Sequence, residues 1–498
     1  MALGVLTQWT ILVAFFHLCS SSRILFVNYW DSKSHLASMM PIAQRLTERG
    51  HQVGFYYEVF KRATLPPQFE DYQIRIESPL TIGDGSQFQD LLWNRNWQPL
   101  FAVPAWGMGA TVHAAVLQNH SSHFNQVVRQ NWDLLVVDPL FSVAAHDLTL
   151  EIQKPYVIFH TSMVEYPLAY FRSLSRVPGL YVPFFLRHQS IDWTSAVFWN
   201  RVEGVIHDLQ FLLVYQLLVQ GQVRSAIKNH QQFSWHTWTA NAALMMTDYL
   251  DTVTPPSPVN QHLITVGGHC PSDQLATLPD QIEKFVSDPN SKGTIVVAFG
   301  TIVTWVAPPE DRISALMDAM NSLTDYRVVW SFKGYTRPVP RHVLMLDWIP
   351  QKQLLLHNNT KLFVSHGGLK SLKETICAQV PAVYMSIFAE QISNAQLAKH
   401  LGFAGYVSKL NKNGTVIAQV MRRVLSSQEP YSKIRRAKRL WLDKIVDSLD
   451  LGAFSLEKAL RRNTEERRKY KCVDVGLWKI LALDIFSIFF LSPFLTLQ

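Results

Sequence analysis

The stretch that most constrains this chain covers residues 348–394. Within it, an apolar strand pattern at residues 361–364 runs into a tight turn made by Gly367 and Gly368, and a helix pattern follows at residues 369–379. A glycine turn that leads into a helix gathers unpaired backbone N–H groups and the positive end of the helix dipole in one place. Such a place suits a phosphate group, so the stretch predicts an anion site on a strand–turn–helix unit.

Polar side chains of the same stretch have the chemistry to hold an organic phosphate at that turn. His366, Lys370 and Ser371 are placed to add hydrogen-bond donors or positive charge at the start of the helix. The same stretch also contains an aromatic residue with a flat indole face, Trp348. Further side chains of this stretch that donate or accept hydrogen bonds are Gln351, Glu374, Glu390 and Gln391. Each residue alone also suits an ordinary structural role, so the prediction depends on their joint spacing.

That joint spacing resembles the donor-binding signature of the UDP-glycosyltransferases, the family that includes the UDP-glucuronosyltransferases. The family pattern is W-x-P-Q, a strand, H-G-G or H-A-G, a small polar residue, Glu, V-P, D-Q and N-A. The matching positions here are Trp348, Pro350, Gln351, His366, Gly367, Gly368, Ser371, Glu374, Val380, Pro381, Glu390, Gln391, Asn394 and Ala395. The resemblance implies that Trp348 stacks on uracil, that Glu374 accepts hydrogen bonds from the ribose, and that Glu390 and Gln391 hold the hexose.

Two positions depart from the family pattern. Lys370 stands where Asn or His is usual, which keeps or strengthens the attraction for a pyrophosphate. Glu390 stands where Asp is usual, so the donor sugar, glucuronic acid or glucose, stays open. Thr301 matches the family's Gly-Ser or Gly-Thr turn near the diphosphate. The sequence contains no metal-ligand spacing, and the UDP-sugar would be a co-substrate, so neither a metal nor another cofactor is expected.

The N-terminal half begins with a strand pattern, a polar loop, a helix pattern and a second strand. The first strand covers residues 23–29, the helix pattern starts at Leu36 and closes at Gly50, and residues 52–57 form the next strand. This order predicts a doubly wound parallel sheet, in which sites lie at the carboxyl ends of the strands.

Two residues of that sheet suit proton transfer. His35 lies in the loop after the first strand, and Asp138 follows a strand at residues 134–137. A carboxylate behind an imidazole fixes its tautomer and stabilises its protonated form. The rival Asp133 precedes the strand and so belongs to the opposite edge. The family resemblance implies that His35 removes a proton from the acceptor and that Asp138 supports it.

At 498 residues the chain is too long for one ordinary core, so two domains are expected. The resemblance implies the GT-B arrangement, two Rossmann-like α/β domains facing across a cleft. We expect an acceptor-binding domain at residues 22–275 and a UDP-sugar-binding domain at residues 276–455. Residues 60–130 read as irregular and aromatic. They could line a pocket for a small lipophilic acceptor or equally form the core of inserted helices.

Both ends of the chain suggest a membrane protein. Residues 1–21 resemble a secretory signal peptide, residues 456–479 form a basic juxtamembrane segment, and residues 480–497 are a short apolar run. A spanning helix and an interfacial lie both remain open for this run, because Asp484 is costly in hydrocarbon. The resemblance implies an endoplasmic reticulum membrane protein with lumenal catalytic domains and a single C-terminal anchor. The net charge of +8 is spread along the chain, so no nucleic-acid surface is indicated.

The cysteines and the rival functions complete the prediction. Cys19, Cys270, Cys377 and Cys472 are far apart, so neither a disulfide framework nor a zinc site is indicated. The main alternative to a transferase is a non-catalytic UDP-sugar-binding or scaffold partner of active relatives, and a homo- or hetero-oligomer stays open. A hydrolase that uses His35 and Asp138 is a third hypothesis, but the sequence lacks a G-x-S-x-G elbow.

Overall fold

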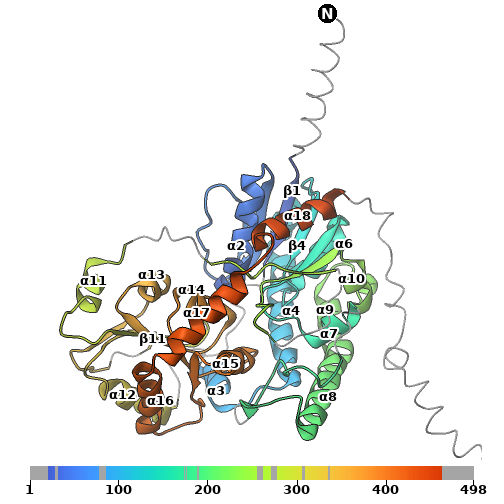
Figure 1. Cartoon of the computed structure of the whole chain (residues 1–498). Coiled ribbons are helices and arrows are strands. Elements are labelled where there is room, and N and C mark those ends of the chain that lie inside the picture. Colours follow the sequence, from blue (N-terminus) through green and yellow to red (C-terminus); the bar gives the residue numbers. More distant parts are fainter. Residues whose placement is uncertain are drawn as a thin grey trace, which may run out of the picture.

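The computed structural model describes residues 21–28, 32–77, 86–172, 174, 177–187, 190–254, 262–270, 277–305, 309–334 and 337–461. Across these residues the chain forms two α/β domains, each built on a parallel sheet with helices on its faces (Figure 1). The predicted fold class, two parallel-sheet domains, is therefore confirmed. The predicted signal peptide, apart from Ser21, and the predicted transmembrane helix at residues 480–497 lie outside the described residues.

The first sheet is parallel and has the strand order β3-β2-β1-β4-β5-β6-β7. Its central strands are almost completely buried, as apolar runs covered on both faces must be. The strand order reverses between β1 and β4, and doubly wound sheets place their sites at the carboxyl ends of the strands at this point. The strands are β1 Arg23–Val27, β2 Gln52–Val59, β3 Glu70–Arg75, β4 Leu134–Val137, β5 Tyr156–His160, β6 Leu244–Thr247 and β7 Leu263–Thr265.

Helix α2 (Lys33–Glu48) begins earlier than its apolar pattern predicted. Ser32 is the N-cap, and its hydroxyl accepts a hydrogen bond from the backbone N–H of His35 at 3.4 Å. A side-chain cap can start a helix before its apolar face begins. His35 therefore lies in the first turn of α2 rather than in a loop, directly beyond the carboxyl end of β1.

The prediction that residues 60–130 are irregular is wrong. The segment contains β3, α3 (Ser86–Asn94), the short 3₁₀ turn η1 (Pro99–Phe101), α4 (Ala102–Asn119) and α5 (Ser121–Val128). Pro104 and two glycines obscured the periodicity of α4. Trp106 on α4 is fully buried, so the alternative of inserted core helices describes this helix.

The rest of the first domain is helical. Its elements are α6 Val143–Ile152, α7 Tyr166–Phe171, α8 Phe198–Leu213, the π-helical turn η3 Val214–Val219, α9 Gln220–Ala226, η4 His230–Gln232 and α10 Trp235–Asn241. By length and composition, two helical runs among the described residues are apolar enough to cross a membrane, Pro99–Asn119 and Phe198–Ala226. Both are partly buried within the domain.

The second sheet is also parallel, in the order β10-β9-β8-β11-β12-β13. Its strands are β8 Thr294–Ala298, β9 Arg327–Ser331, β10 Val343–Leu346, β11 Thr360–Ser365, β12 Ala382–Tyr384 and β13 Ala404–Tyr406. Its helices are α11 Asp280–Val286, α12 Glu310–Asn321, α13 Gln351–Leu356, α14 Leu369–Ala378, α15 Gln391–His400, α16 Gly414–Ser426 and α17 Glu429–Leu442.

The last described helix, α18 (Ser448–Arg461), returns to the first domain and lies beside α2 (Figure 1). Asp450 on α18 accepts from Arg45 at 2.5 Å, and Leu456 is fully buried in the core that α2 forms with the first sheet. The expected domain boundary at residue 455 falls inside this helix.

Conversely, a segment from the first half of the chain packs against the second domain. Helix α3 packs on the second domain, where Leu92 and Trp93 join the apolar core and the Trp93 ring lies 5.3 Å from that of Trp305. Gln89 donates to the carbonyl of Ile302 at 2.9 Å and accepts from the N–H of Thr304 at 3.0 Å. This helix therefore holds the loop that follows β8.

The structure contains one disulfide bond that the spacing of the cysteines did not indicate. Cys270 and Cys377 are bonded, with 5.6 Å between their Cα atoms, although 107 positions separate them in the sequence. The chain that leaves β7 passes the carboxyl end of α14, and sequence spacing alone gives no sign of this approach. The bond ties the linker between the domains to the second domain.

We expect α18 to stabilise the first domain through its buried face. Leu456→Ala removes a fully buried side chain and should lower the free energy of unfolding by about 2–5 kcal/mol. The control is Phe454→Ala on the same helix, because the Phe454 side chain is 50% exposed and should cost less than about 1 kcal/mol. Chemical denaturation measures both. Equal losses would contradict the placement of α18.

The disulfide should also stabilise the fold. The double variant Cys270→Ser with Cys377→Ser should lose roughly 2–4 kcal/mol, because the unfolded chain regains the freedom of a long loop. Denaturation with and without a reductant measures this. The reductant should destabilise the wild type and leave the double variant unchanged, and equal sensitivity of both would rule out the bond.

Candidate active site

The two residues predicted for proton transfer meet in the structure. The Nδ1 atom of His35 lies 2.6 Å from Oδ2 of Asp138. Strands β1 and β4 are parallel neighbours with Val27 opposite Val137, so the residues that follow them emerge at the same edge. Asp138 is fully buried, whereas the His35 side chain is 16% exposed. With Nδ1 at the carboxylate, Nε2 is the ring nitrogen that can take a proton.

Thr161 joins this pair and was missed by sequence reasoning. Its hydroxyl donates to Oδ2 of Asp138 at 2.9 Å and lies 2.6 Å from Nδ1 of His35. The other carboxylate oxygen, Oδ1, accepts from the backbone N–H of Leu140 at 3.0 Å. Thr161 follows β5, the neighbour of β4, so the rule that sites gather at the carboxyl ends of strands could have identified it.

The second domain reaches this pair through Glu390. Burial raises the pKa of Glu390, which its own backbone N–H and the nearby His35 partly offset. Glu165, at the start of α7, also lies near Asp138 and Glu390. Burial raises its pKa to about 8, although Tyr215 donates a hydrogen bond to it. The imidazole of His35 and two carboxyls whose pKa values are raised by burial therefore lie close together where the two domains face each other.

The glycine turn between β11 and α14 has the predicted shape. Gly367 has a φ of +84°, and a Cβ on it would lie 3.0 Å from the carbonyl of Gln391. The His366 ring lies between two glycines, because a Cβ on Gly368 or on Gly300 would lie 2.6 or 2.9 Å from it. The loop that carries Thr301 therefore approaches the amino end of α14.

His366 was predicted to add either a hydrogen-bond donor or positive charge at this turn. Burial lowers the pKa of His366 to about 4, so at neutral pH the ring is neutral, with one nitrogen that can donate a hydrogen bond and one that can accept. Ser371 is buried in the first turn of α14. Positive charge near the turn therefore has to come from lysines and from the helix dipole.

The residues predicted to bind the uridine lie on the same side of the second sheet. Gln351, the first residue of α13, donates from Nε2 to Oε2 of Glu374 at 2.5 Å. Burial raises the pKa of Glu374. The indole of Trp348 is 69% exposed, which is rare for so large an apolar side chain and leaves its surface accessible to a ligand.

Two predicted donor residues have other partners in this structure. Lys370 forms an ion pair with Asp248 of the first domain. The amide oxygen of Gln391 accepts from the backbone N–H groups of Ile387 and Phe388, at 2.9 and 3.1 Å. Gln391 therefore shapes the loop before α15, and Glu390 is left as the carboxyl of this pair that faces the first domain.

Further lysines of both domains lie near one another, with Asp347 as an opposing negative charge beside them. Burial lowers the pKa of Lys333, which follows β9, and the nearby charges of Lys33 and Lys61 in the first domain lower it further. Lysines that are close enough to repel one another attract an anionic ligand. Among the described residues, no group of three or more His, Cys, Asp or Glu side chains is arranged to hold a metal ion.

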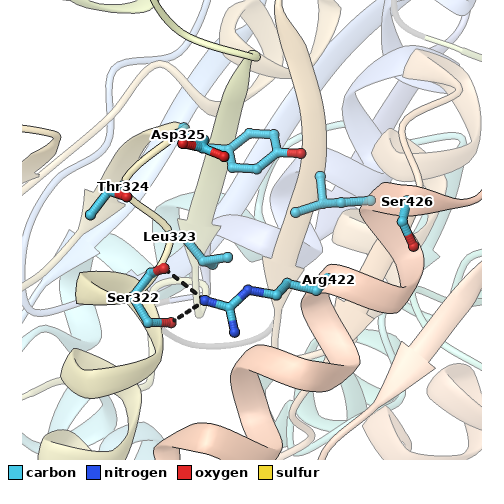
Figure 2. Close-up of a pocket in the computed structure, with 8 residues that line it drawn as sticks. Ser322, Leu323, Thr324, Asp325, Arg422 and Ser426 are labelled. Carbon is cyan, nitrogen blue, oxygen red and sulfur yellow. Dashed lines mark hydrogen bonds between the residues drawn. The ribbon is translucent and has the colours of Figure 1, made fainter.

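A surface hollow of about 290 Å³ lies apart from these residues (Figure 2). Its lining includes Asp325, which precedes β9 and therefore lies at the amino end of the second sheet. Arg422 crosses it and donates to the carbonyl and the hydroxyl of Ser322 at 2.7 and 3.0 Å. The hollow contains none of the predicted site residues.

Solved structures support the two-domain arrangement. The chain resembles the glycotransferase of kitacinnamycin, with a TM-score of 0.60 and 14% identity over 89% of this chain and all of that one. It also resembles UGT71G1 of Medicago truncatula, solved with UDP-glucose, with a TM-score of 0.59 and 17% identity over 88% of this chain and 98% of that one. Both likenesses indicate the GT-B glycosyltransferase fold.

Sequence comparisons agree over nearly the whole chain. UDP-glycosyltransferase UGT5 of Dactylopius coccus is 24% identical, over 96% of this chain and 90% of its own. Human UDP-glucuronosyltransferase 1A10 is 23% identical, over 93% of this chain and 87% of its own. A profile of the family described as "UDP-glucoronosyl and UDP-glucosyl transferase" matches residues 89–496. The chain therefore belongs to the UDP-glycosyltransferase family, whose members use a UDP-sugar as co-substrate.

Proposed function

We propose that this chain transfers glucuronic acid or glucose from the UDP-sugar to a hydroxyl-type nucleophile of a small lipophilic acceptor, with inversion at the anomeric carbon. The observation that carries the proposal is the 2.6 Å contact between His35 and Asp138, with Glu390 of the other domain close by. A general base of one domain then faces the sugar held by the other.

The chemistry follows from this placement. Nε2 of His35 removes the proton of the acceptor hydroxyl while its oxygen attacks the anomeric carbon. The bond from that carbon to the diphosphate breaks on the opposite side, and UDP leaves with the bonding electrons. Asp138 stabilises the imidazolium that forms, and Thr161 holds Asp138 in place. The amino end of α14 stabilises the negative charge on the departing diphosphate.

Each part of the donor would meet its own group of residues. Trp348 stacks on uracil, and Gln351 with Glu374 bonds the uridine. Gly368, Thr301 and the neutral His366 face the diphosphate, where Ser371 completes the first turn of α14. Glu390 bonds the sugar hydroxyls, and because burial favours its neutral form it repels an acidic sugar less than an ionised carboxylate would.

A lipophilic acceptor is proposed because aromatic rings meet between the domains near Glu390. The ring centroid of Trp97 lies 5.0 Å from that of Phe101 and 5.5 Å from that of Phe388. Phe388 is two residues before Glu390. By contrast, Trp93 and Trp106 are fully buried and belong to the cores. Ring faces near a reacting hydroxyl favour apolar acceptors.

For the location we propose the lumenal side of the endoplasmic reticulum membrane, with residues 480–497 as the single anchor. The disulfide supports an oxidising compartment. The helical run Phe198–Ala226 exposes several large apolar side chains, among them Trp199 at 73% and Leu217 at 71%, which suits contact with a membrane surface.

The base is tested on the full chain with labelled UDP-glucuronic acid and UDP-glucose and a panel of lipophilic alcohols. We expect His35→Ala to abolish transfer, and Asp138→Asn to slow it by orders of magnitude, while calorimetry shows UDP affinity close to that of the wild type. An acceptor that is already ionised, such as an acidic phenol, should depend less on His35. Near wild-type transfer to a neutral alcohol by His35→Ala would exclude His35 as the base. A wild type that binds UDP but transfers to no acceptor would be the non-catalytic partner instead.

The base-stacking residue is tested by UDP affinity alone. Trp348→Ala should cost roughly 1–3 kcal/mol of binding free energy, and Trp348→Phe should cost less because a ring remains. Removing an exposed side chain should leave the thermal unfolding midpoint unchanged, so the loss can be assigned to the ligand. Wild-type UDP affinity in the alanine variant would exclude stacking.

A further inference from the structure

One carboxylate of the first domain faces two lysines of the second. Asp248 follows β6 and is fully buried. Its Oδ1 atom lies 2.5 Å from Nζ of Lys373, and its Oδ2 contacts Nζ of Lys370. Both lysines are on α14, whose amino end is the proposed diphosphate site. The two lysines together carry one positive charge more than the single carboxylate of Asp248 can neutralise.

The groups around this cluster do not remove the surplus. Burial lowers the pKa of His269 to about 4, so this neighbour is neutral at pH 7. Glu374 also lies near Lys373, and burial raises its pKa, but its Oε2 has a partner of its own in the Gln351 amide at 2.5 Å. Asp248 itself stays ionised, because the attraction of the two lysines outweighs the effect of burial and lowers its pKa.

The two lysines are not equivalent. The Lys373 side chain is 7% exposed, and its ammonium group lies 5.8 Å from the ring of Trp441, so it is held in the protein interior. The Lys370 side chain is 25% exposed and stands in the first turn of α14, two residues after Gly368. Lys370 is therefore the partner of Asp248 that can turn toward a ligand at the amino end of the helix.

A second contact links the same segment of the first domain to the glycine turn. The Tyr249 hydroxyl donates to Oδ1 of Asn394 at 2.9 Å, and Nδ2 of Asn394 donates to the carbonyl of Gly367 at 3.0 Å. The end of β6 thus contacts the proposed donor site at two points, one through Lys370 and one through Asn394.

We propose that Lys370 is shared between Asp248 and the diphosphate of the donor. Without donor it pairs with Asp248, and when donor binds it moves to the diphosphate while Lys373 keeps Asp248 neutralised. Asp248 then competes with the donor, and Lys373 weakens that competition without touching the ligand. This inference rests on the proposed donor site and assigns to Asp248 and Lys373 the tuning of its affinity.

The test measures UDP binding to the full chain by calorimetry. Lys370→Met should weaken binding roughly tenfold or more, because it removes a charge-assisted contact with the diphosphate. Lys373→Met should also weaken binding, because Lys370 is then the sole counter-ion of Asp248. The double variant Asp248→Asn with Lys373→Met removes one charge of each sign and frees Lys370, so it should bind UDP more tightly than the wild type.

A matched control is Lys292→Met, which removes a lysine from the exposed pair with Asp325 at the opposite edge of the sheet and should leave UDP affinity unchanged. A purely structural role of the cluster predicts that both Lys373→Met and the double variant bind UDP more weakly. Weaker or unchanged binding by the double variant would overturn the competition, and wild-type affinity of Lys370→Met would overturn the contact with the diphosphate. A wild type that does not bind UDP would instead overturn the proposed function.

Discussion

The parallel pairing of β1 with β4 is the constraint on which the rest of the site depends. It joins residues that are more than a hundred positions apart and brings the chain out of both strands at one edge, where His35 meets Asp138. Because β5 is paired to β4 in the same sense, Thr161 arrives at the same place. In the second sheet, the turn after β11 likewise lies at the carboxyl edge and leads into α14. Two sheets whose carboxyl edges face each other therefore bring the proposed base close to the proposed donor site.

What the sequence could predict was local. Apolar runs revealed most strands, and the glycine turn revealed the amino end of α14, because these signals depend on neighbours along the chain. The starts and interiors of some helices were missed, since the cap at Ser32 and Pro104 in α4 disturb the periodicity. Among pairs formed between distant segments, His35 with Asp138 was predicted from the strand ends and the family resemblance, whereas the others left no local signal. Lys370 was identified as a departure from the family pattern, but its partner Asp248 lies 122 residues away in the other domain.

The two domains are joined by more than their linker. Helix α18 completes the core of the first domain, and helix α3 enters the core of the second domain. Asp248 of the first domain forms an ion pair with Lys373 on α14, beside the proposed donor site. Each contact restricts a different element that carries site residues: α2 with His35, the loop with Thr301, and the first turn of α14. The geometry between the proposed base and the proposed donor site is thus set by crossings of the chain as well as by the packing of two surfaces.

The position of α3 has a consequence for recombination among relatives. An exchange of halves at the linker would combine the second domain of one parent with the α3 of another, so that Leu92 and Trp93 would enter a core that did not evolve with them. The buried Lys409, which donates to the carbonyls of Leu92, Arg95 and Ile387, would likewise meet a foreign backbone. Helix α3 holds the loop that carries Thr301, next to the proposed donor site. In hybrid proteins, donor preference should therefore depend on two stretches of the gene, the second half and the short segment that encodes α3.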